Sequence, residues 1–261
     1  MIQFTIVTIT YNAAKVLGKT LDSIETQTYP YFEHLIIDGA STDNTLAIAR
    51  DYQSRMSRQS RDAVTPPVTI VSEPDNGLYD AMNKGLSMAT GDYILFLNAG
   101  DFLPEATTLE TVANSVGEGE ELPAVLYGDT DIVDQNYRFL RHRRLAPPQQ
   151  LSWRSFRQGM LVCHQAFYAR TDIAKEQPYN LAFRHSADVD WCIRVMKEAE
   201  RRGLTLRNVN AVVANFLEGG DSAVNHRASL RERFQVMRRH YGLFTTLAMH
   251  LWFVLRAALR P

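Results

Sequence analysis

The chain has 261 residues, of which 45% are hydrophobic and 22% are charged. This length fits one large domain or a domain with an appendage, and the composition is typical of a globular protein. The formal net charge of −1 gives no reason to expect nucleic acid as a partner. The charge is unevenly distributed, however. Seven arginines and one glutamate from Asn225 onward give that segment a net charge of +6, against −7 for the residues before it.

The cysteine content and the N-terminal sequence indicate in which cellular compartment the protein is found. The chain has two cysteines, Cys163 and Cys192, and no CxxC pair, so neither a disulfide framework nor a zinc site is expected. Met1 leads directly into a strand-like run, without the basic and apolar regions of a signal peptide. We therefore expect a reduced, cytoplasmic protein.

The first hundred residues alternate between two kinds of hydrophobic pattern. Apolar or β-branched runs predict strands at 4–10, 32–37, 68–71 and 93–97. Helical periodicity predicts helices at 16–24, from 41–43 through 49, and at 78–89. Residues 51–67 are polar and basic, which indicates an exposed loop or an extended helix end. This alternation predicts a mostly parallel sheet with right-handed crossovers.

The second half is less regular. Residues 124–127 are predicted to form a strand that ends at Gly128-Asp129, and 131–144 a hairpin with a basic end. A short strand is expected at 164–169 and one or two more at 204–216. Residues 187–201 have the 3.6-residue apolar period of a helix.

Polar clusters follow the predicted strands in chain order. They stand at 8–12 (TITYN), 38–43 (DGASTD), 75–85 (DNGLYDAMNKG) and 98–101 (NAGD). In an open α/β sheet, ligands bind beyond the carboxyl ends of the strands, so these clusters are expected to meet at one site.

The order and spacing of these clusters resemble the family 2 glycosyltransferases of the GT-A fold. Within that family, the chain is similar to the subgroup that builds bacterial exopolysaccharides such as colanic acid. The resemblance implies an α/β fold with a mostly parallel central sheet flanked by helices. It divides residues 1–220 into a nucleotide-sugar-binding half, 1–105, and an acceptor half with a mixed sheet, 106–220. A basic and apolar helical segment, 221–261, follows.

The resemblance implies a set of residues around a nucleotide-diphosphate-sugar donor. Tyr11 matches an aromatic residue that lies against the base; alternatively it is a half-buried packing residue. Asp38 matches the acid that accepts a hydrogen bond from the base, whereas Ser41 and Asp43 are expected to be helix caps. The other expected donor residues are Thr8, Thr10, Asn12, Asp75, Asp80, Asn83, Lys84 and Asn98, of which Lys84 is alternatively an ordinary solvated helix residue.

The metal motif departs from the pattern of the family. Many relatives carry an Asp-x-Asp run after the fourth strand, but here Asn98 and Gly100 replace acids and only Asp101 remains. An asparagine oxygen can still ligate Mn²⁺ or Mg²⁺ when phosphates and waters complete the shell, so we expect a divalent cation with Asp101 as its ligand. His226 is a further candidate ligand, or a solvent-facing residue.

The expected catalytic base lies at the start of the helix at 187–201. The motif aligns Asp188 with the base of the family, with Ala187 in place of the preceding acid. Alternatively Asp188 and Asp190 only favour the helix N-terminus by capping and through the macrodipole. The expected acceptor-side residues are His164, Gln165, Asp190 and Trp191; a histidine or tryptophan at these positions can equally belong to the core.

Residues 243–255 form an apolar run that begins after Arg238-Arg239 and ends before Arg256. It is shorter than the ~20 residues needed to span a bilayer. We expect a helix that lies in the membrane interface with Trp252 near the headgroups, or one that packs on the core or on the partner in a homodimer.

Together these features predict an inverting glycosyltransferase at the inner face of the cytoplasmic membrane, acting on a glycan or lipid-linked acceptor. The chain has no QxxRW motif and no set of spanning segments, which argues against a processive synthase. A nucleotidyltransferase would carry a basic, glycine-rich loop, which residues 8–15 lack. A catalytically inactive nucleotide-sugar-binding or scaffold protein is the remaining alternative, because the motif at 98–101 is degenerate.

Overall fold

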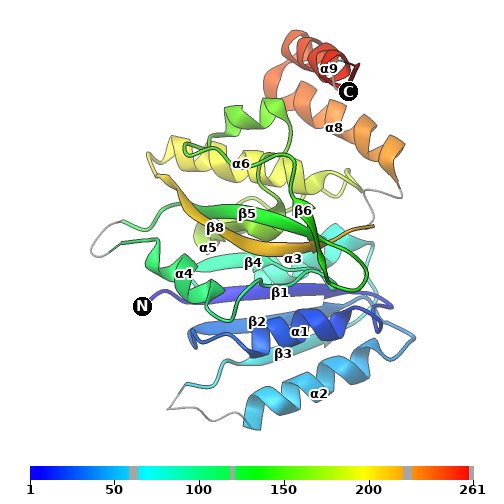
Figure 1. The fold of residues 1–261 in the computed structure, drawn as a ribbon, viewed down its shortest axis with the longest axis vertical. Coiled ribbons are helices and arrows are strands. Elements are labelled where there is room, and N and C mark those ends of the chain that lie inside the picture. The colour runs from blue at the N-terminus through cyan, green and yellow to red at the C-terminus, as the bar shows by residue number, and fades with distance from the viewer. Residues whose placement is uncertain (59–63, 118–120, 220–224, 259–261) are drawn as a thin grey trace.

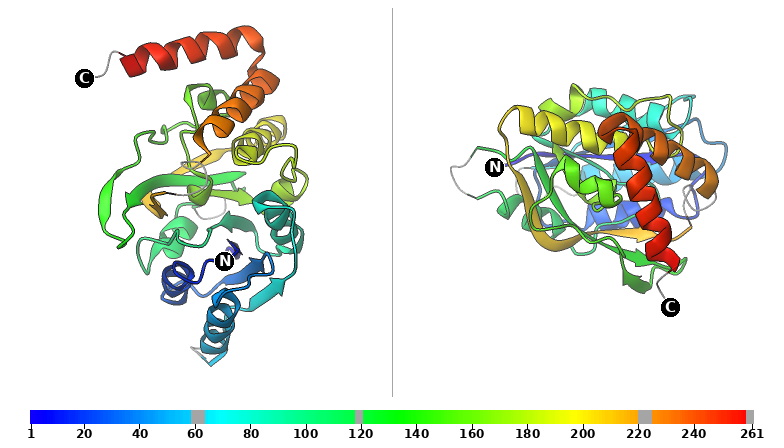
Figure 2. Two further views of the ribbon diagram at one scale, coloured as in Figure 1. Left: turned by 90° about the vertical axis from the view of Figure 1, so that its right-hand side faces the viewer. Right: turned by 90° about the horizontal axis from the view of Figure 1, so that it is seen from above.

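The computed structural model describes residues 1–58, 64–117, 121–219 and 225–258. They form one α/β unit around a single sheet with strand order β3-β2-β1-β4-β7-β5-β6, in which β8 also pairs with β5 (Figure 1). Helices lie on both faces of this sheet (Figure 2). The expected α/β fold with a mostly parallel central sheet flanked by helices is confirmed.

The first half contains the predicted parallel strands β1 (Phe4–Thr10), β2 (Phe32–Asp38), β3 (Val68–Ser72) and β4 (Tyr93–Phe96). The predicted helices between them are α1 (Leu17–Glu25), α2 (Thr45–Arg58) and α3 (Leu78–Met88). Part of the polar stretch 51–67 thus extends α2, while residues 59–63 lie outside the described part of the chain.

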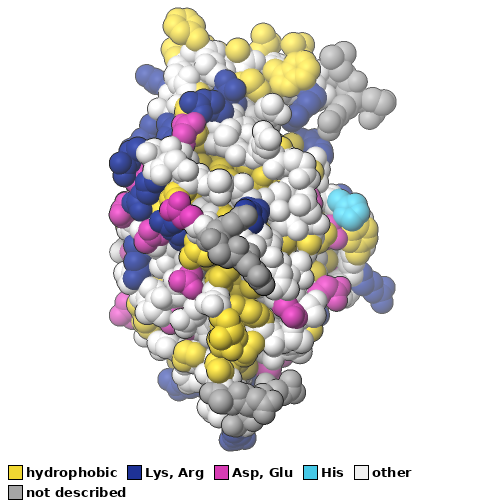
Figure 3. Space-filling view, turned by 90° about the vertical axis from the view of Figure 1, so that its left-hand side faces the viewer, with side chains coloured by type: hydrophobic (Ala, Val, Ile, Leu, Met, Phe, Trp, Pro, Cys, Tyr) yellow, Lys and Arg dark blue, Asp and Glu magenta, His cyan; other side chains and the backbone are white. Residues whose placement is uncertain are grey.

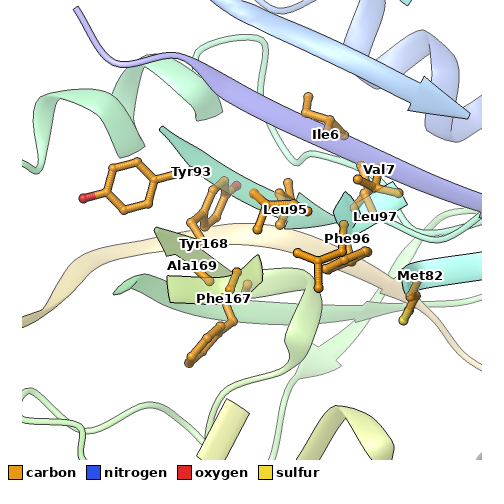
Figure 4. Packing of buried hydrophobic residues seen from close by; sticks show 14 of the residues in the cluster. Ile6, Val7, Met82, Tyr93, Leu95, Phe96, Leu97, Phe167, Tyr168 and Ala169 are labelled. Atoms are coloured by element: carbon orange, nitrogen blue, oxygen red, sulfur yellow. The ribbon is translucent and has the colours of Figure 1, made fainter. Parts of the chain in front are cut away.

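The core is centred on β4, because helices cover both faces of the sheet there. Every residue of β4 is fully buried, which is why this strand is an unbroken apolar run rather than an alternating one. Around it Figure 4 shows Val7 from β1, Met82 from α3 and Phe167 from β7 (Phe167–Arg170). The buried side chains of β1 and β4 hold both strands in place. The polar clusters at 8–12 and 98–101 lie at the ends of these two strands.

The mixed half differs from the prediction at Gly128-Asp129. Strand β5 (Val125–Val133) does not end there, but continues into the predicted hairpin with β6 (Phe139–His142). A Cβ on Gly128 would lie 2.6 Å from the carbonyl oxygen of Ala211 in β8 (Leu206–Leu217). Gly128 therefore permits close approach of β8 at a register shift, and does not mark a turn.

Short helical segments complete the fold, several of which the pattern did not predict. These are α4 (Thr108–Asn114), α5 (Thr171–Lys175) and the 3₁₀ turns Trp153–Gln158 and His164–Ala166. The second turn replaces the first half of the strand expected at 164–169. The predicted helix at 187–201 is α6 (Ala187–Arg201).

The C-terminal segment consists of α8 (His226–Tyr241) and α9 (Leu243–Ala258), at the end of the molecule farthest from β3 (Figure 1). The expected boundary at 220 falls in 220–224, outside the described residues, as does the side chain of His226. Within the described chain, no helix is long and apolar enough to cross a membrane.

Candidate active site

The ends of β1 and β2 are joined by hydrogen bonds through Asn12. Its backbone has a positive φ of 47°, an allowed conformation for asparagine. The Asn12 Oδ1 accepts a hydrogen bond from the Thr42 amide at 2.9 Å, and the Asn12 amide donates to Ser41 Oγ at 2.8 Å. Asn12 therefore holds the two loops together through its Oδ1 atom and its backbone amide.

Asp38 is the last residue of β2. It is 1% exposed, and its carboxylate accepts hydrogen bonds from the amide and hydroxyl of Ser41 and from Ser72 Oγ. These bonds connect the ends of β2 and β3. Contact between Asp38 and the base of a donor stays a prediction.

A pocket of about 700 Å³, here called the β1 pocket, opens beyond these loops. Thr10, Tyr11, Asp75 and Asn98 are among its lining residues. Tyr11 is 64% exposed as a residue, so a planar ligand could stack on its ring. The buried Thr10 Oγ1 has no hydrogen-bond partner among the described residues. Tyr11 thus gives the β1 pocket an exposed aromatic side chain, while the Thr10 hydroxyl is covered by protein.

The loop from Glu73 to Gly77 forms one wall of the β1 pocket and is held from α3. Lys84 Nζ pairs with Glu73 and donates to the Pro74 carbonyl, both at 2.9 Å. Asp80 accepts a hydrogen bond from the Asn76 amide at 2.9 Å. Lys84 therefore acts on this pocket indirectly, by fixing the loop that carries Asp75.

Asn83, also expected at the donor, instead bonds across the molecule to Tyr179. Its Nδ2 donates to the Tyr179 carbonyl at 3.0 Å, and its Oδ1 accepts from the Tyr179 amide at 2.7 Å. Both polar atoms of this side chain are thereby used in holding α3 against the second half of the chain.

Gly39 is required by the close approach of Asp75 to the end of β2. A Cβ at Gly39 would lie 2.5 Å from Asp75 Oδ2 and 3.4 Å from the Tyr11 ring. We expect Gly39→Ala to displace the Asp75 side chain from its place in the pocket wall and to weaken nucleotide binding by roughly 3- to 10-fold. The melting temperature should change little, because the end of a flexible side chain can move aside. Titration calorimetry with Gly18→Ala as the control, a glycine with nothing within 4 Å of its Cβ position, checks this. Unchanged nucleotide affinity would place the ligand elsewhere.

A second pocket of about 490 Å³, the α6 pocket, lies beside the first. The two pockets share Leu78, Asn98, Ala99 and His185 as lining residues. The two pockets therefore adjoin at the turn after β4, and together they are called the cleft. The expected base Asp188 and two of the four expected acceptor-side residues, His164 and Gln165, line the α6 pocket.

Asp188 lies in the first turn of α6 and is held on both carboxylate oxygens. Tyr79 Oη donates to Oδ1 at 3.2 Å, and His164 Nδ1 lies 3.4 Å from Oδ2. The other ring nitrogen of His164 lies 3.2 Å from the Asn98 Nδ2, which can only donate. The His164 ring is thus held between Asn98 on one side and Asp188 on the other.

The surroundings keep Asp188 ionised. Burial raises the pKa of this carboxyl, but the hydrogen bond and charge of His164, with the Arg233 guanidinium and the Val189 amide, more than offset it. The resulting pKa lies below the usual value of 3.8. Asp188 is therefore a carboxylate at neutral pH, next to open space, and can accept a proton from a bound hydroxyl.

Asp101 is buried at the floor of the α6 pocket. Its carboxylate accepts hydrogen bonds from Gln165 Nε2 at 2.7 Å and from the Leu217 amide at 3.0 Å. Burial raises its pKa to about 6, although both hydrogen bonds and the nearby His164 oppose this shift. Folding thus favours the protonated form, so this effect stabilises the fold below pH 3.8 and is lost as pH rises through about 6.

The residues present suit a weakly held divalent cation. No group of three or more His, Cys, Asp or Glu side chains that could hold a metal occurs in the described part of the chain. However, the buried Asn98 Oδ1 has no partner among the described residues, and Asp101 lines the same pocket. Mg²⁺ and Mn²⁺ bound to a diphosphate need one or two protein oxygens, so this donor set fits.

Three expected site residues point into the protein and not into the cleft. Thr8 bonds to His34 in the core, at 2.9 Å. Asp190 is completely buried and pairs with Arg194 at 2.7 Å and with His240 at 2.8 Å. Trp191 is completely buried, and its ring stacks on that of Tyr179 with 4.9 Å between the ring centroids. A sugar cannot reach these two acceptor-side candidates in this structure, because protein side chains cover them.

The cleft also contains basic residues that the motifs did not single out. Arg184 and His185 line the β1 pocket, and Arg143 and Arg233 line the α6 pocket. Glu232 of α8 accepts hydrogen bonds from the Arg184 and His185 amides at 2.9 and 2.8 Å. Arg184 and His185 could have been noticed because they precede Asp188 closely. Nothing in the local sequence predicts that α8 brings Arg233 to the cleft.

A family model described as glycosyl transferase family 2 matches residues 5–177. This chain belongs to glycosyl transferase family 2. This glycosyltransferase is 38% identical, over 218 residues, to the PGL/p-HBAD biosynthesis glycosyltransferase of Mycobacterium bovis (strain BCG / Pasteur 1173P2). That match covers 83% of this chain and 77% of the relative. It is 25% identical to the amylovoran biosynthesis glycosyltransferase AmsB of Erwinia amylovora, over 82% of this chain and 69% of the relative.

Solved structures of the GT-A type have the same fold. S. aureus TarS 1-349 in complex with UDP-GlcNAc superposes with a TM-score of 0.70 at 19% identity. That match covers 90% of this chain and 64% of that one, so this glycosyltransferase spans less than two thirds of its length. The mannosyltransferase PcManGT from Pyrobaculum calidifontis, in complex with GDP-Man and Mn²⁺, superposes with a TM-score of 0.62 at 16% identity. That match covers 100% of this chain and 76% of that one.

Proposed function

We propose that this glycosyltransferase transfers one sugar from a nucleotide-diphosphate-sugar in the β1 pocket to a hydroxyl group of an acceptor in the α6 pocket, with inversion at the anomeric carbon. The observation that carries this proposal is the position of Asp188. Its ionised carboxylate borders the α6 pocket, which joins the β1 pocket at Asn98 and Ala99. A base on the acceptor side is what attack from the face opposite the leaving diphosphate requires.

In this mechanism Asp188 takes the proton of the acceptor hydroxyl as the new glycosidic bond forms. His164 and Tyr79 are positioning residues, because their hydrogen bonds fix both carboxylate oxygens. Asn98 in turn orients the His164 ring. Removing the proton during attack makes a weakly nucleophilic sugar alcohol reactive, which is worth roughly 10²- to 10⁴-fold in rate.

The leaving diphosphate needs positive charge near the junction of the pockets. The Arg184 guanidinium, which lines the β1 pocket, would supply part of it. Asn98 and Asp101 would hold a divalent cation, and such a cation, when bound, would neutralise charge on the diphosphate oxygens. Binding of GDP-Man with Mn²⁺ by the structurally similar PcManGT supports this part of the proposal.

The names of related proteins support a class of donor and acceptor. UDP-GlcNAc and GDP-Man are bound by structural neighbours, which favours a UDP- or GDP-sugar donor. The relatives act in PGL/p-HBAD biosynthesis and in amylovoran biosynthesis. We therefore infer a glycan or lipid-linked acceptor in surface polysaccharide or glycolipid biosynthesis, used at the inner face of the cytoplasmic membrane.

The stereochemistry of the product tests the proposal. Even without an acceptor, Asp188 should activate water, so slow hydrolysis of the correct α-linked donor is expected to release the β-sugar first. Proton NMR of the anomeric signals, recorded before mutarotation, measures this. Release of the α-sugar would exclude inversion, and intact donor after prolonged incubation with a panel of nucleotide sugars would favour a pure binding protein.

A further inference from the structure

Helix α9 exposes only apolar side chains over most of its length. Between residues 243 and 255, every residue that is exposed is apolar. The most exposed are Phe244 at 89%, Val254 at 66%, Leu251 at 62% and Trp252 at 51%. Isolated apolar residues on a surface need no explanation, but a whole helix face of them marks an interaction site.

Two polar side chains of α9, Thr246 and His250, are turned away from this exposed face. Thr246 is completely buried and donates to the Gly242 carbonyl at 2.7 Å. His250 lies 2.9 Å from the Thr246 carbonyl through Nδ1, and its ring packs against Phe234 of α8. The Thr246 hydroxyl and the His250 Nδ1 atom thus bond to the backbone of their own helix. The exposed side of α9 is therefore its more apolar side, whereas a surface helix in water usually turns its apolar face toward the core.

Positive charge borders this apolar face. The described residues of α8 and α9 contain six arginines and one glutamate, and Arg227, Arg231, Arg238 and Arg239 of α8 are exposed. The single acid, Glu232, is bonded to the backbone at Arg184 and His185. Figure 3 shows apolar side chains gathered at the α9 end of the molecule, with lysine and arginine side chains beside them.

We propose that the exposed face of α9 inserts into the interface of an anionic lipid bilayer, with the arginines of α8 at the level of the lipid headgroups. A helix with one apolar face, bordered by basic residues and carrying a tryptophan, has the chemistry of an interfacial anchor. A second copy of the chain is the less suitable occupant. It would bring a second set of arginines toward the first, and like charges oppose such an interface.

Docking of α9 would also orient the cleft, because α8 joins the two. Glu232 holds the backbone at 184–185, and Ser186 Oγ donates to the Ser229 carbonyl at 3.2 Å. These contacts fix the start of α6, which carries Asp188. The α6 pocket would then lie at a constant orientation to the bilayer, as a lipid-linked acceptor requires. The docking itself does not depend on the proposed reaction.

Flotation of the full chain with lipid vesicles tests the proposal. We expect the protein to float with vesicles that contain phosphatidylglycerol, and much less with phosphatidylcholine alone. Leu251→Glu, alone or with Leu247→Glu, should reduce flotation by roughly tenfold or more. Met88→Glu, an equivalent change at an exposed apolar residue of α3, should have no effect. Asp188→Asn should float like the wild type, so failure of catalysis and failure of docking remain distinguishable.

Two results would overturn the proposal. One is the absence of flotation with anionic vesicles by protein that is folded by circular dichroism. The other is a stable dimer in lipid-free buffer that Leu251→Glu converts to monomers, because the face would then be covered by a second copy. If the glutamate variants do not fold, Arg238→Glu with Arg239→Glu replaces them. Both positions are exposed, and unchanged binding of that variant to anionic vesicles would equally contradict the role of the arginines.

Discussion

Asp188→Asn is expected to lower kcat by about 10²- to 10⁴-fold, because an amide cannot accept the proton of the acceptor hydroxyl. Donor affinity should change little, since Asp188 borders the α6 pocket and not the β1 pocket. The pKa of Asp188 lies below 3.8, so the base is ionised throughout the neutral range. The acid limb that it contributes to the pH profile should therefore lie below pH 3.8. Steady-state kinetics with a fixed donor measure both effects.

Asp190→Asn is the matched control for this variant. Asp190 lies two residues further along α6, but it is completely buried between Arg194 and His240. Its loss should destabilise the protein by about 3–5 kcal/mol and leave kcat of the folded fraction largely intact. A large loss of kcat in Asp190→Asn with an unchanged melting temperature, and a mild effect of Asp188→Asn, would assign the base to Asp190.

Trp191→Ala is expected to reduce the free energy of unfolding by about 3–5 kcal/mol. The indole ring is completely buried, stacks on Tyr179, and makes edge contacts with Phe96 and Phe167 at 5.7 Å. Its removal leaves a cavity beside β4, where the surrounding strands cannot collapse inward. Urea denaturation followed by circular dichroism gives the free energy.

Trp191→Phe serves as the control, because it keeps an aromatic ring in the same space and should lose a smaller part of this energy. If Trp191→Ala instead retained its stability and raised KM for the acceptor alone, Trp191 would act on the acceptor side as its sequence position first indicated.

The sheet was predictable from the sequence because its central strands are buried on both faces. Runs such as 93–97 are too apolar for an exposed position, and the helical period between them indicates parallel crossovers. The extent of β5 was not predictable. Gly128-Asp129 has the composition of a turn, and only the close approach of β8 reveals that Gly128 lies within a strand. That contact joins residues about eighty positions apart in the chain.

The position of several candidate residues at the cleft was predictable, because these residues follow a strand end or begin a helix. Tyr11, Asn98, Asp101 and Asp188 all line the cleft. The opposite directions of Asp188 and Asp190 could also have been inferred, because two positions along an α-helix differ by about 200°. Arg233 could not, since it comes from α8, whose position depends on tertiary contacts. The hydrogen bonds that engage Asp38 and Asn83 are likewise decided only by folding.

Binding of nucleotide sugars is the measurement that tests the account most directly. Calorimetric titration of the wild-type chain with UDP-, GDP- and dTDP-sugars, each with and without Mn²⁺, would identify the donor. We predict selective binding of one nucleotide class, strengthened by Mn²⁺ and weakened in Gly39→Ala. Asp101→Ala should lose the effect of Mn²⁺, provided that its melting temperature shows it to be folded. Absence of binding to every donor by folded wild-type protein would contradict the assignment of the β1 pocket and the transfer reaction built on it.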